Sequence, residues 1–125
     1  MEWHFDDNMP IYTQLVYQIK FAIVSGELSP GERMAGVRDL AADAGVNPNT
    51  MQKALAELER MGLVYSQRTS GRFVTDDEGR IQEMKRETAR ETIQTFLQQM
   101  KNMGFEKEEI IDLIREEKEG ASHEQ

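Results

Sequence analysis

The stretch VRDLAADAGVNPNTMQKALAELERMG, residues 37–62, decides the fold of this chain, because it predicts two helices joined by a tight turn. Apolar residues recur at helical spacing over Val37–Ala44, which predicts a short helix there. Gly45 follows directly and is placed to end that helix.

A second helix follows at once, and two residues mark its start. Asn47 offers a side-chain oxygen as a cap, and Pro48 takes the first helical position, where its missing N–H costs nothing. The helix is predicted to run to about Met61, and Gly62 is placed to end it. Two helices joined by a short turn that contains Gly predict a helix-turn-helix, whose second helix can lie in the major groove of DNA.

Two short β-prone runs, Leu63–Ser66 and Arg72–Thr75, follow the second helix. The loop Gln67–Gly71 between them ends in Gly, which predicts a hairpin with a longer loop. Apolar side chains on this hairpin can close the core over the helices. The predicted fold of residues 1–75 is therefore a winged helix-turn-helix, mainly α with a small β-hairpin.

Upstream, Pro10–Ser25 is predicted to be an amphipathic helix, and Leu28–Gly31 is predicted to be a turn. Each helix has an apolar face that we expect to be buried. These faces comprise Ile11, Leu15, Ile19, Ala22 and Ile23, then Val37, Leu40 and Ala41, and then Met51, Ala54, Leu55 and Leu58.

Downstream of the hairpin, the polar run Asp76–Gly79 is the predicted linker and domain boundary. One helix is predicted over about Arg80–Met103 and another over about Glu106–Glu119. Residues 80–119 then form a two-helix hairpin, and the tail Gly120–Gln125 is expected to be disordered.

This C-terminal hairpin has more apolar surface than it can bury internally, and a helix without a partner is marginal in water. We expect a second copy of the chain to cover the surface, which makes residues 80–119 a homodimerisation element. The residues expected at the dimer interface are Ile81, Met84, Thr88, Ile93, Phe96, Leu97, Met100, Ile110, Ile111 and Ile114.

Composition limits the class of protein. The chain has 125 residues, 38% of them hydrophobic, and no cysteine, so disulfides and thiolate metal sites are excluded. We expect no signal peptide, no membrane span and a cytoplasmic protein. His4 and His123 lack a surrounding carboxylate constellation, and there is no catalytic triad or Gly-rich phosphate loop. We therefore expect no metal, no cofactor and no enzymatic activity.

The net charge of −8 is unevenly distributed along the chain. Residues 33–75 carry six Lys or Arg against four Asp or Glu, whereas residues 76–125 carry eight against fourteen. The acidity therefore lies mostly downstream of the predicted DNA reader, and we expect weak non-specific DNA affinity.

Six motifs in this order resemble the GntR family of bacterial transcriptional regulators. The matching stretches are Pro10–Leu15, Ile23–Glu32, Val37–Ala41, Val46–Thr50, Ala54–Glu59 and Gly62–Val64. The short two-helix C-terminus resembles the YtrA subfamily, whose members lack the large effector-binding domain of other branches. The resemblance implies a DNA-binding transcriptional regulator, and members of that subfamily commonly repress genes of ABC transporters.

Two positions depart from the family pattern. The family usually has Leu-Pro-Ser before Val37, and its serine caps the helix and contacts a phosphate, whereas Gly36 can do so only through its backbone. In the wing the family usually has Gly after the basic residue, whereas Thr69 follows Arg68 here.

The resemblance implies that Arg38 reaches a base, for which guanine O6 and N7 offer a bidentate match. The alternative is a surface salt bridge between Arg38 and Asp39 or Asp43. The other residues expected to contact DNA are Asn47, Asn49, Thr50, Gln52 and Lys53 at the second helix, and Arg68, Ser70, Gly71 and Arg72 in the wing. For each of these the alternative is an ordinary capped or solvated surface.

Two functions from different classes follow. The first is a homodimeric, sequence-specific DNA-binding regulator, expected to be a repressor that binds a palindromic operator. The second is a winged-helix protein-interaction module that docks a partner through its acidic helices and does not read DNA. The sequence names neither the operator nor the regulated genes nor a small-molecule effector, although a ligand at a Met-rich dimer interface is one option.

Overall fold

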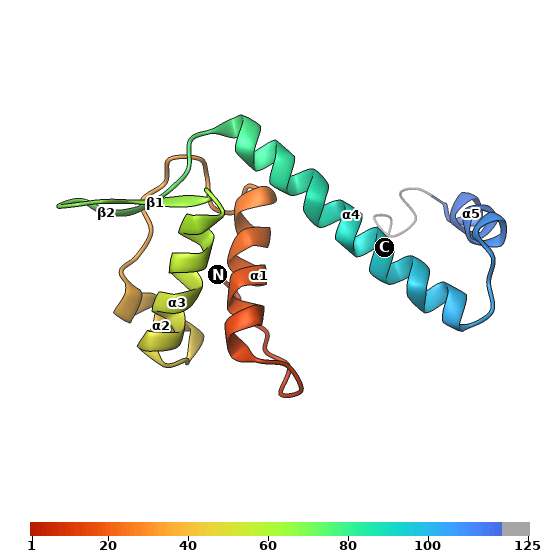
Figure 1. Cartoon of the computed structure of the whole chain (residues 1–125), viewed down its shortest axis with the longest axis horizontal. Coiled ribbons are helices and arrows are strands. Elements are labelled where there is room, and N and C mark those ends of the chain that lie inside the picture. Colours follow the sequence, from red (N-terminus) through yellow and green to blue (C-terminus); the bar gives the residue numbers. More distant parts are fainter. Residues whose placement is uncertain (119–125) are drawn as a thin grey trace. The chain divides into compact units, whose positions relative to one another are not determined.

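A computed structural model of the chain describes residues 1–118, so the predicted tail Gly120–Gln125 lies outside the described residues. The chain divides into two units, Met1–Arg86 and the residues from Glu87 onward. The elements in chain order (Figure 1) are α1 (Ile11–Val24), α2 (Val37–Ala44), α3 (Pro48–Arg60), β1 (Val64–Gln67), β2 (Gly71–Val74), α4 (Glu78–Asn102) and α5 (Lys107–Glu116). This order confirms the predicted mainly α fold with one small hairpin.

The core of the first unit lies where α1 and α2 pack against α3. The predicted apolar faces of α1 and α3 are the faces that the fold buries. They supply Leu15, Ile19, Ala22 and Ile23 from α1 and Met51, Ala54, Leu55 and Leu58 from α3. The shorter α2 adds the buried Ala41 and the half-buried Val37 and Leu40. Full burial of a Leu or Ile side chain stabilises a fold by about 1.5–3 kcal/mol, so these faces hold the three helices together.

The turn between α2 and α3 has the local structure that its residues predict. Gly45 ends α2 with φ +72°, a left-handed conformation that favours glycine. Asn47 then accepts a hydrogen bond on Oδ1 from the backbone N–H of Asn49 at 2.7 Å, and Pro48 begins α3. The tight turn thereby fixes where α3 starts.

Replacing Asn47 with alanine should lower the free energy of unfolding by about 1 kcal/mol, because an N–H at the start of α3 loses its acceptor. Asn47→Asp is the matched control, since its carboxylate keeps the acceptor and suits a helix N-terminus. Urea unfolding of both variants and of the parent measures the effect. Equal stability of Asn47→Ala and the parent would show that this cap does not stabilise α3.

The hairpin is a two-stranded antiparallel sheet in which Tyr65 pairs with Phe73 and Gln67 with Gly71. A third segment, which the sequence did not predict, runs beside β2. Arg33 forms an isolated β-bridge with Phe73, and the N–H of Met34 donates to the carbonyl of Arg72 at 2.8 Å. The chain before α2 is therefore tied directly to the wing.

The start of α4 belongs to the first unit, which corrects two predictions. Residues 76–79 were predicted to be a linker, but α4 begins at Glu78, and the boundary between the units falls after Arg86. Ile81 and Met84 were expected at the dimer interface, yet they are buried in the core of the first unit, with 6% and 5% of their surface exposed. Apolar residues on a helix face do not reveal which neighbour covers them.

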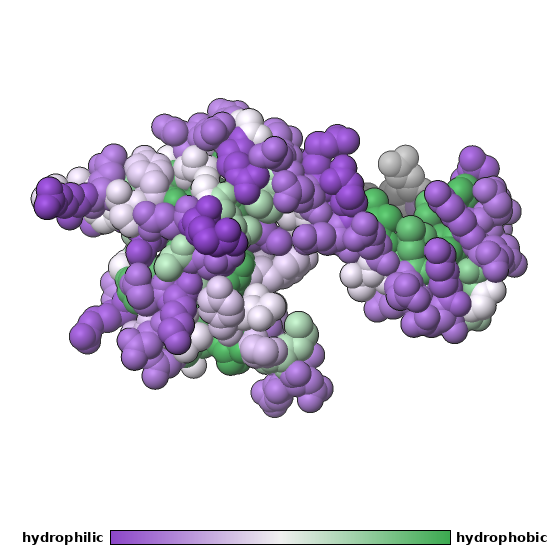
Figure 2. Space-filling view, viewed as in Figure 1, coloured by the Kyte–Doolittle hydropathy of each residue, from purple (hydrophilic) through white to green (hydrophobic). Residues whose placement is uncertain are grey.

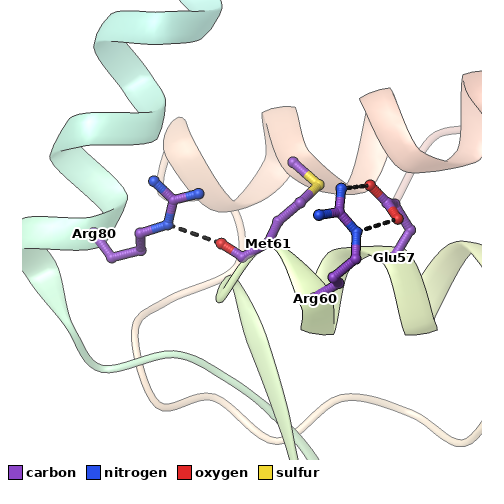
Figure 3. A network of polar contacts seen from close by, with 4 residues as sticks. All are labelled: Glu57, Arg60, Met61 and Arg80. Atoms are coloured by element: carbon purple, nitrogen blue, oxygen red, sulfur yellow. Dashed lines mark hydrogen bonds and ion pairs between the residues drawn. The ribbon is translucent and has the colours of Figure 1, made fainter.

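Figure 3 shows how the start of α4 is fastened to the end of α3. Arg80 of α4 donates from Nε to the carbonyl oxygen of Met61 at 2.8 Å. That carbonyl follows the last turn of α3, where backbone acceptors have no partner within the helix. A side chain of α4 thus supplies a hydrogen-bond donor to the C-terminal end of α3.

Glu57 and Arg60, also drawn in Figure 3, form an ion pair one turn apart on α3. The hydrogen bond from Arg60 holds the pKa of the Glu57 carboxyl below its ordinary value. A pair of this kind on a helix surface contributes little to stability, and that contribution is lost as the pH falls through the lowered pKa.

The second unit contains the rest of α4 and all of α5. Glu106 and Glu109 form a capping box at the start of α5, where the N–H of Glu106 donates to Oε1 of Glu109 at 2.8 Å. Thr88 and Ile110 were expected at the dimer interface, but both are buried within the chain, which corrects that expectation. Leu97, Met100 and Ile111 are half-buried.

An exposed apolar surface remains on this unit, and Figure 2 shows its hydrophobic side chains in green. The large apolar side chains exposed there are Ile93, Phe96, Met103, Leu113 and Ile114. Within residues 1–118, no helix is long and apolar enough to cross a membrane.

Candidate nucleic-acid interface

Arg38 lies in the first turn of α2 with its side chain exposed. Among residues 1–118 it forms no ion pair, so the alternative prediction of a salt bridge to Asp39 or Asp43 is wrong. Asp43 instead accepts a hydrogen bond from Nε1 of Trp3 at 2.9 Å. The Arg38 guanidinium is therefore available to an external ligand.

The backbone just before Arg38 shows the effect of the departure at residue 36. Gly36 is the N-cap of α2, and no side chain caps the helix there. Its carbonyl accepts the N–H of Leu40 at 2.9 Å, so the helix starts in the ordinary way. Because Gly36 replaces the family's serine, α2 has no side-chain cap, but its backbone hydrogen bonding is unchanged.

The outer face of α3 presents polar side chains opposite its buried face. Asn49, Gln52 and Lys53 are exposed, and Thr50 is half-buried. Their spacing of three and four residues places the first three on one side of the helix. No hydrogen bond or ion pair within residues 1–118 engages the side chains of Gln52 and Lys53, which leaves this face open to a partner.

The tip of the hairpin is polar and exposed, and it projects from the helices (Figures 1 and 2). Arg68 and Ser70 lie in the turn between β1 and β2, and Gly71 begins β2 with φ +104°. Figure 1 shows the hairpin and α2 on the same side of the first unit, with α1 on the other side of α3. The structure thus brings α2, which carries Arg38, and the hairpin to one side of the first unit.

Arg72 does not join Arg68 at the tip, which corrects its predicted place in the DNA-contacting wing. Its side chain is 16% exposed, and its Nε lies 3.9 Å from Oε1 of Glu59 on α3. The same Glu59 oxygen accepts a hydrogen bond from Oγ of Ser66 at 3.1 Å. Because successive side chains in a strand point to opposite faces, the Arg72 side chain lies on the face of β2 that meets α3.

Arg33 is a cation at the wing that sequence reasoning missed. Its side chain is exposed, and Nε donates to the carbonyl of Ser70 at 2.7 Å. These residues are 37 positions apart, so no local pattern indicates the contact. A β-prone alternation at residues 32–34 would have been the only signal, and it is too short to identify a strand.

The site has the composition of a nucleic-acid surface. Its exposed cations are Arg33, Arg38, Lys53 and Arg68, from two helices, the wing and the segment beside it. In the part of the chain that the structure describes, no three His, Cys, Asp or Glu side chains form a group that could hold a metal ion. Phosphate oxygens and base edges are the partners that such a set of donors fits.

Comparison with known proteins identifies what the chain is similar to. The family model described as "Bacterial regulatory proteins, gntR family" matches residues 11–74. The chain is 38% identical over 120 residues to the "Uncharacterized HTH-type transcriptional regulator YhcF" of Bacillus subtilis (strain 168), which covers 96% of this chain and 99% of that protein. It is 32% identical over 110 residues to the "HTH-type transcriptional repressor YtrA" of the same organism, which covers 87% and 85%.

Solved structures give the same result. A GntR family transcriptional regulator from Listeria monocytogenes superposes with a TM-score of 0.83 at 37% identity, covering 91% of this chain and 100% of that one. AraR(DBD) in complex with operator ORR3 superposes with a TM-score of 0.51 at 29% identity, covering 60% of this chain and 88% of that one. The second of these is a complex with operator DNA.

Proposed function

This chain belongs to the gntR family of bacterial regulatory proteins, and we propose on that premise that it is a repressor that binds a palindromic operator as a homodimer. As a member it is a DNA-binding transcriptional regulator and not an enzyme. The observation that carries the proposal is the exposed Arg38 of α2, which has no ion-pair partner within residues 1–118. Figure 1 shows α2 on the same side of the first unit as the hairpin. The family match favours this function over a protein-interaction module.

Each element has a separate role in the proposed complex. The start of α3 enters the major groove, where Asn49 and Gln52 face base edges and Lys53 pairs with a phosphate. Arg38 reads guanine from the first turn of α2. The tip residues Arg68 and Ser70 approach the minor groove, whose negative potential attracts arginine. Asn47, Thr50 and Gly71 position these contacts through the cap, the helix and the turn.

Dimerisation is proposed to use the exposed apolar side chains of the second unit. Ile93 and Ile114 are each 55% exposed, and Phe96 lies one turn from Ile93 on α4. Covering such a surface with a second copy is favourable, since burial of apolar area drives association. Two-fold symmetry then requires half-sites related by a two-fold axis, spaced by about one helical turn of DNA or a multiple of it.

The regulated genes are proposed to encode a transporter, and the proposed location is the cytoplasm, where bacterial chromosomal DNA lies. The support is the resemblance to the YtrA subfamily, together with the likeness to the repressor YtrA over 87% of this chain and 85% of that protein. No effector is assigned.

Capture of fragmented genomic DNA by the purified protein, followed by sequencing at near-physiological salt, tests the proposal. We expect an enriched palindrome, and its position upstream of transporter genes would support the proposed target. A variant with charge reversal at Arg38, Lys53 and Arg68 is the matched control and should enrich nothing. A folded, dimeric parent protein that enriches no palindrome would contradict the proposed operator.

A further inference from the structure

The segment before α2 forms an extra edge on the wing. Three backbone hydrogen bonds tie it to β2. Gly31 donates to the carbonyl of Val74 at 3.0 Å, Met34 donates to Arg72 at 2.8 Å, and Val74 donates to Glu32 at 2.8 Å. Arg33 sits in the middle of this pairing, opposite Phe73. Its backbone is therefore held in a fixed register with the hairpin.

The side chain of Arg33 extends along the hairpin to the tip. Its Nε donates to the carbonyl of Ser70 at 2.7 Å. A Cβ placed on Gly71 would lie 3.3 Å from both Nε and Nη2 of Arg33, so the guanidinium rests on the bare backbone of that glycine. The absence of a side chain at residue 71 makes this close approach possible.

Most of the donors of Arg33 remain unused. A guanidinium has five N–H donors, and the bond to Ser70 takes one of them. No other hydrogen bond or ion pair of Arg33 occurs among residues 1–118, and its side chain is exposed. The free Nη groups lie beside a turn whose own cation, Arg68, is also exposed.

We propose that Arg33 is a DNA-binding residue that braces the wing tip through Ser70 and gives its free Nη donors to a DNA phosphate. This inference rests on the proposed function, because it requires the wing to lie against DNA. The planar guanidinium allows both contacts at once, since Nε and the Nη atoms point along different edges of one group. The lysine ammonium is a compact charge on a flexible stem and lacks this planar arrangement of donors. Lysine at residue 33 should therefore supply the charge to a phosphate without bracing Ser70.

The test compares Arg33→Ala, Arg33→Lys and the parent, with Kd for the operator measured between about 50 and 200 mM salt, the range over which phosphate contacts are lost. We expect Arg33→Ala to raise Kd about tenfold and to reduce the slope of log K against log salt by about 1, as the loss of one phosphate contact requires. Arg33→Lys should keep the slope and bind with intermediate affinity. Lys85→Ala removes an exposed cation of α4 as the matched control and should change neither quantity.

A second measurement follows the brace in the free protein. The backbone amide signal of Gly71 in a ¹⁵N–¹H spectrum adjoins the Ser70 carbonyl, so it should shift in both Arg33 variants and stay in place in Lys85→Ala. Thermal unfolding of each variant checks that the fold is intact, which is expected because Arg33 is exposed.

Each outcome decides a part of the proposal. An unchanged salt slope in Arg33→Ala would overturn the phosphate contact, and an unchanged Gly71 signal in both variants would overturn the brace. If the parent selects no operator, the proposed function fails, but the slope measured on non-specific duplex DNA still decides the phosphate contact. A reduced slope there would support it.

Discussion

Replacing Ile93 and Phe96 together with glutamate should convert the protein to monomers and weaken binding to a two-half-site operator by about 10²- to 10⁴-fold. Both side chains are large, apolar and exposed on the second unit, at 55% and 38% of their surface. Two carboxylates in an apolar interface would lose hydration without gaining partners, which is strongly unfavourable. Without the partner, each half-site would be bound independently, and the gain from linking two binding events would be lost.

Sedimentation velocity measures the oligomeric state, and titration of full and half operators measures the loss. Thr95→Glu is the matched control, because residue 95 is about 200° around the helix from residue 93 at 100° per residue. It should leave both the dimer and the affinity unchanged. The double variant should bind a single half-site as well as one winged-helix unit of the parent does. A double variant that remains dimeric would place the interface elsewhere.

Replacing Arg38 with alanine should cost about 1–3 kcal/mol of operator affinity, which corresponds to roughly 5- to 150-fold in Kd. The guanidinium is exposed and has no ion-pair partner within residues 1–118, so its loss leaves no unpaired carboxylate inside the protein. The affected property should be discrimination among operator sequences, since base contacts specify while phosphate contacts position. Competition between the operator and versions with a single changed base pair measures that discrimination.

Arg38→Lys separates charge from geometry at the same position. Lysine keeps the positive charge but cannot reproduce the planar pair of donors, so it should retain non-specific affinity and lose discrimination. Non-specific duplex DNA is the control ligand, on which Arg38→Lys should equal the parent. Undiminished discrimination in Arg38→Ala would show that another residue reads the base.

Local chemistry explains why the helix-turn-helix could be predicted almost to the residue. The start and end of α2 at Val37 and Ala44 follow from an apolar pattern and a glycine, and the start of α3 follows from Asn47 and Pro48. Capping and turn conformations depend on residues that are neighbours in the chain, so a sequence contains all the information that they need. The exposed state of Asn49, Gln52 and Lys53 follows from the same helical periodicity.

Contacts between distant segments explain what could not be predicted. Ile81 and Met84 belong to an apolar helix face, but only the packed chain shows that the first unit covers them. Arg68 and Arg72 both belong to the predicted wing. The Arg72 side chain, however, lies on the face of β2 that meets α3, where it approaches Glu59. Hydrophobic burial is non-directional. A periodic pattern therefore predicts that a helix face is buried, but it does not identify the segment that covers that face.

The sequence by itself determined the family of this protein, the bounds of α2 and the start of α3, because these depend on spacing, caps and turns over a few residues. Only the tertiary structure decided that Arg33 reaches Ser70, that Arg80 joins α4 to the end of α3, and that the units divide after Arg86. The physical reason is the same in each case. Such contacts join segments far apart in the chain, and their geometry exists only after the helices and the hairpin have packed.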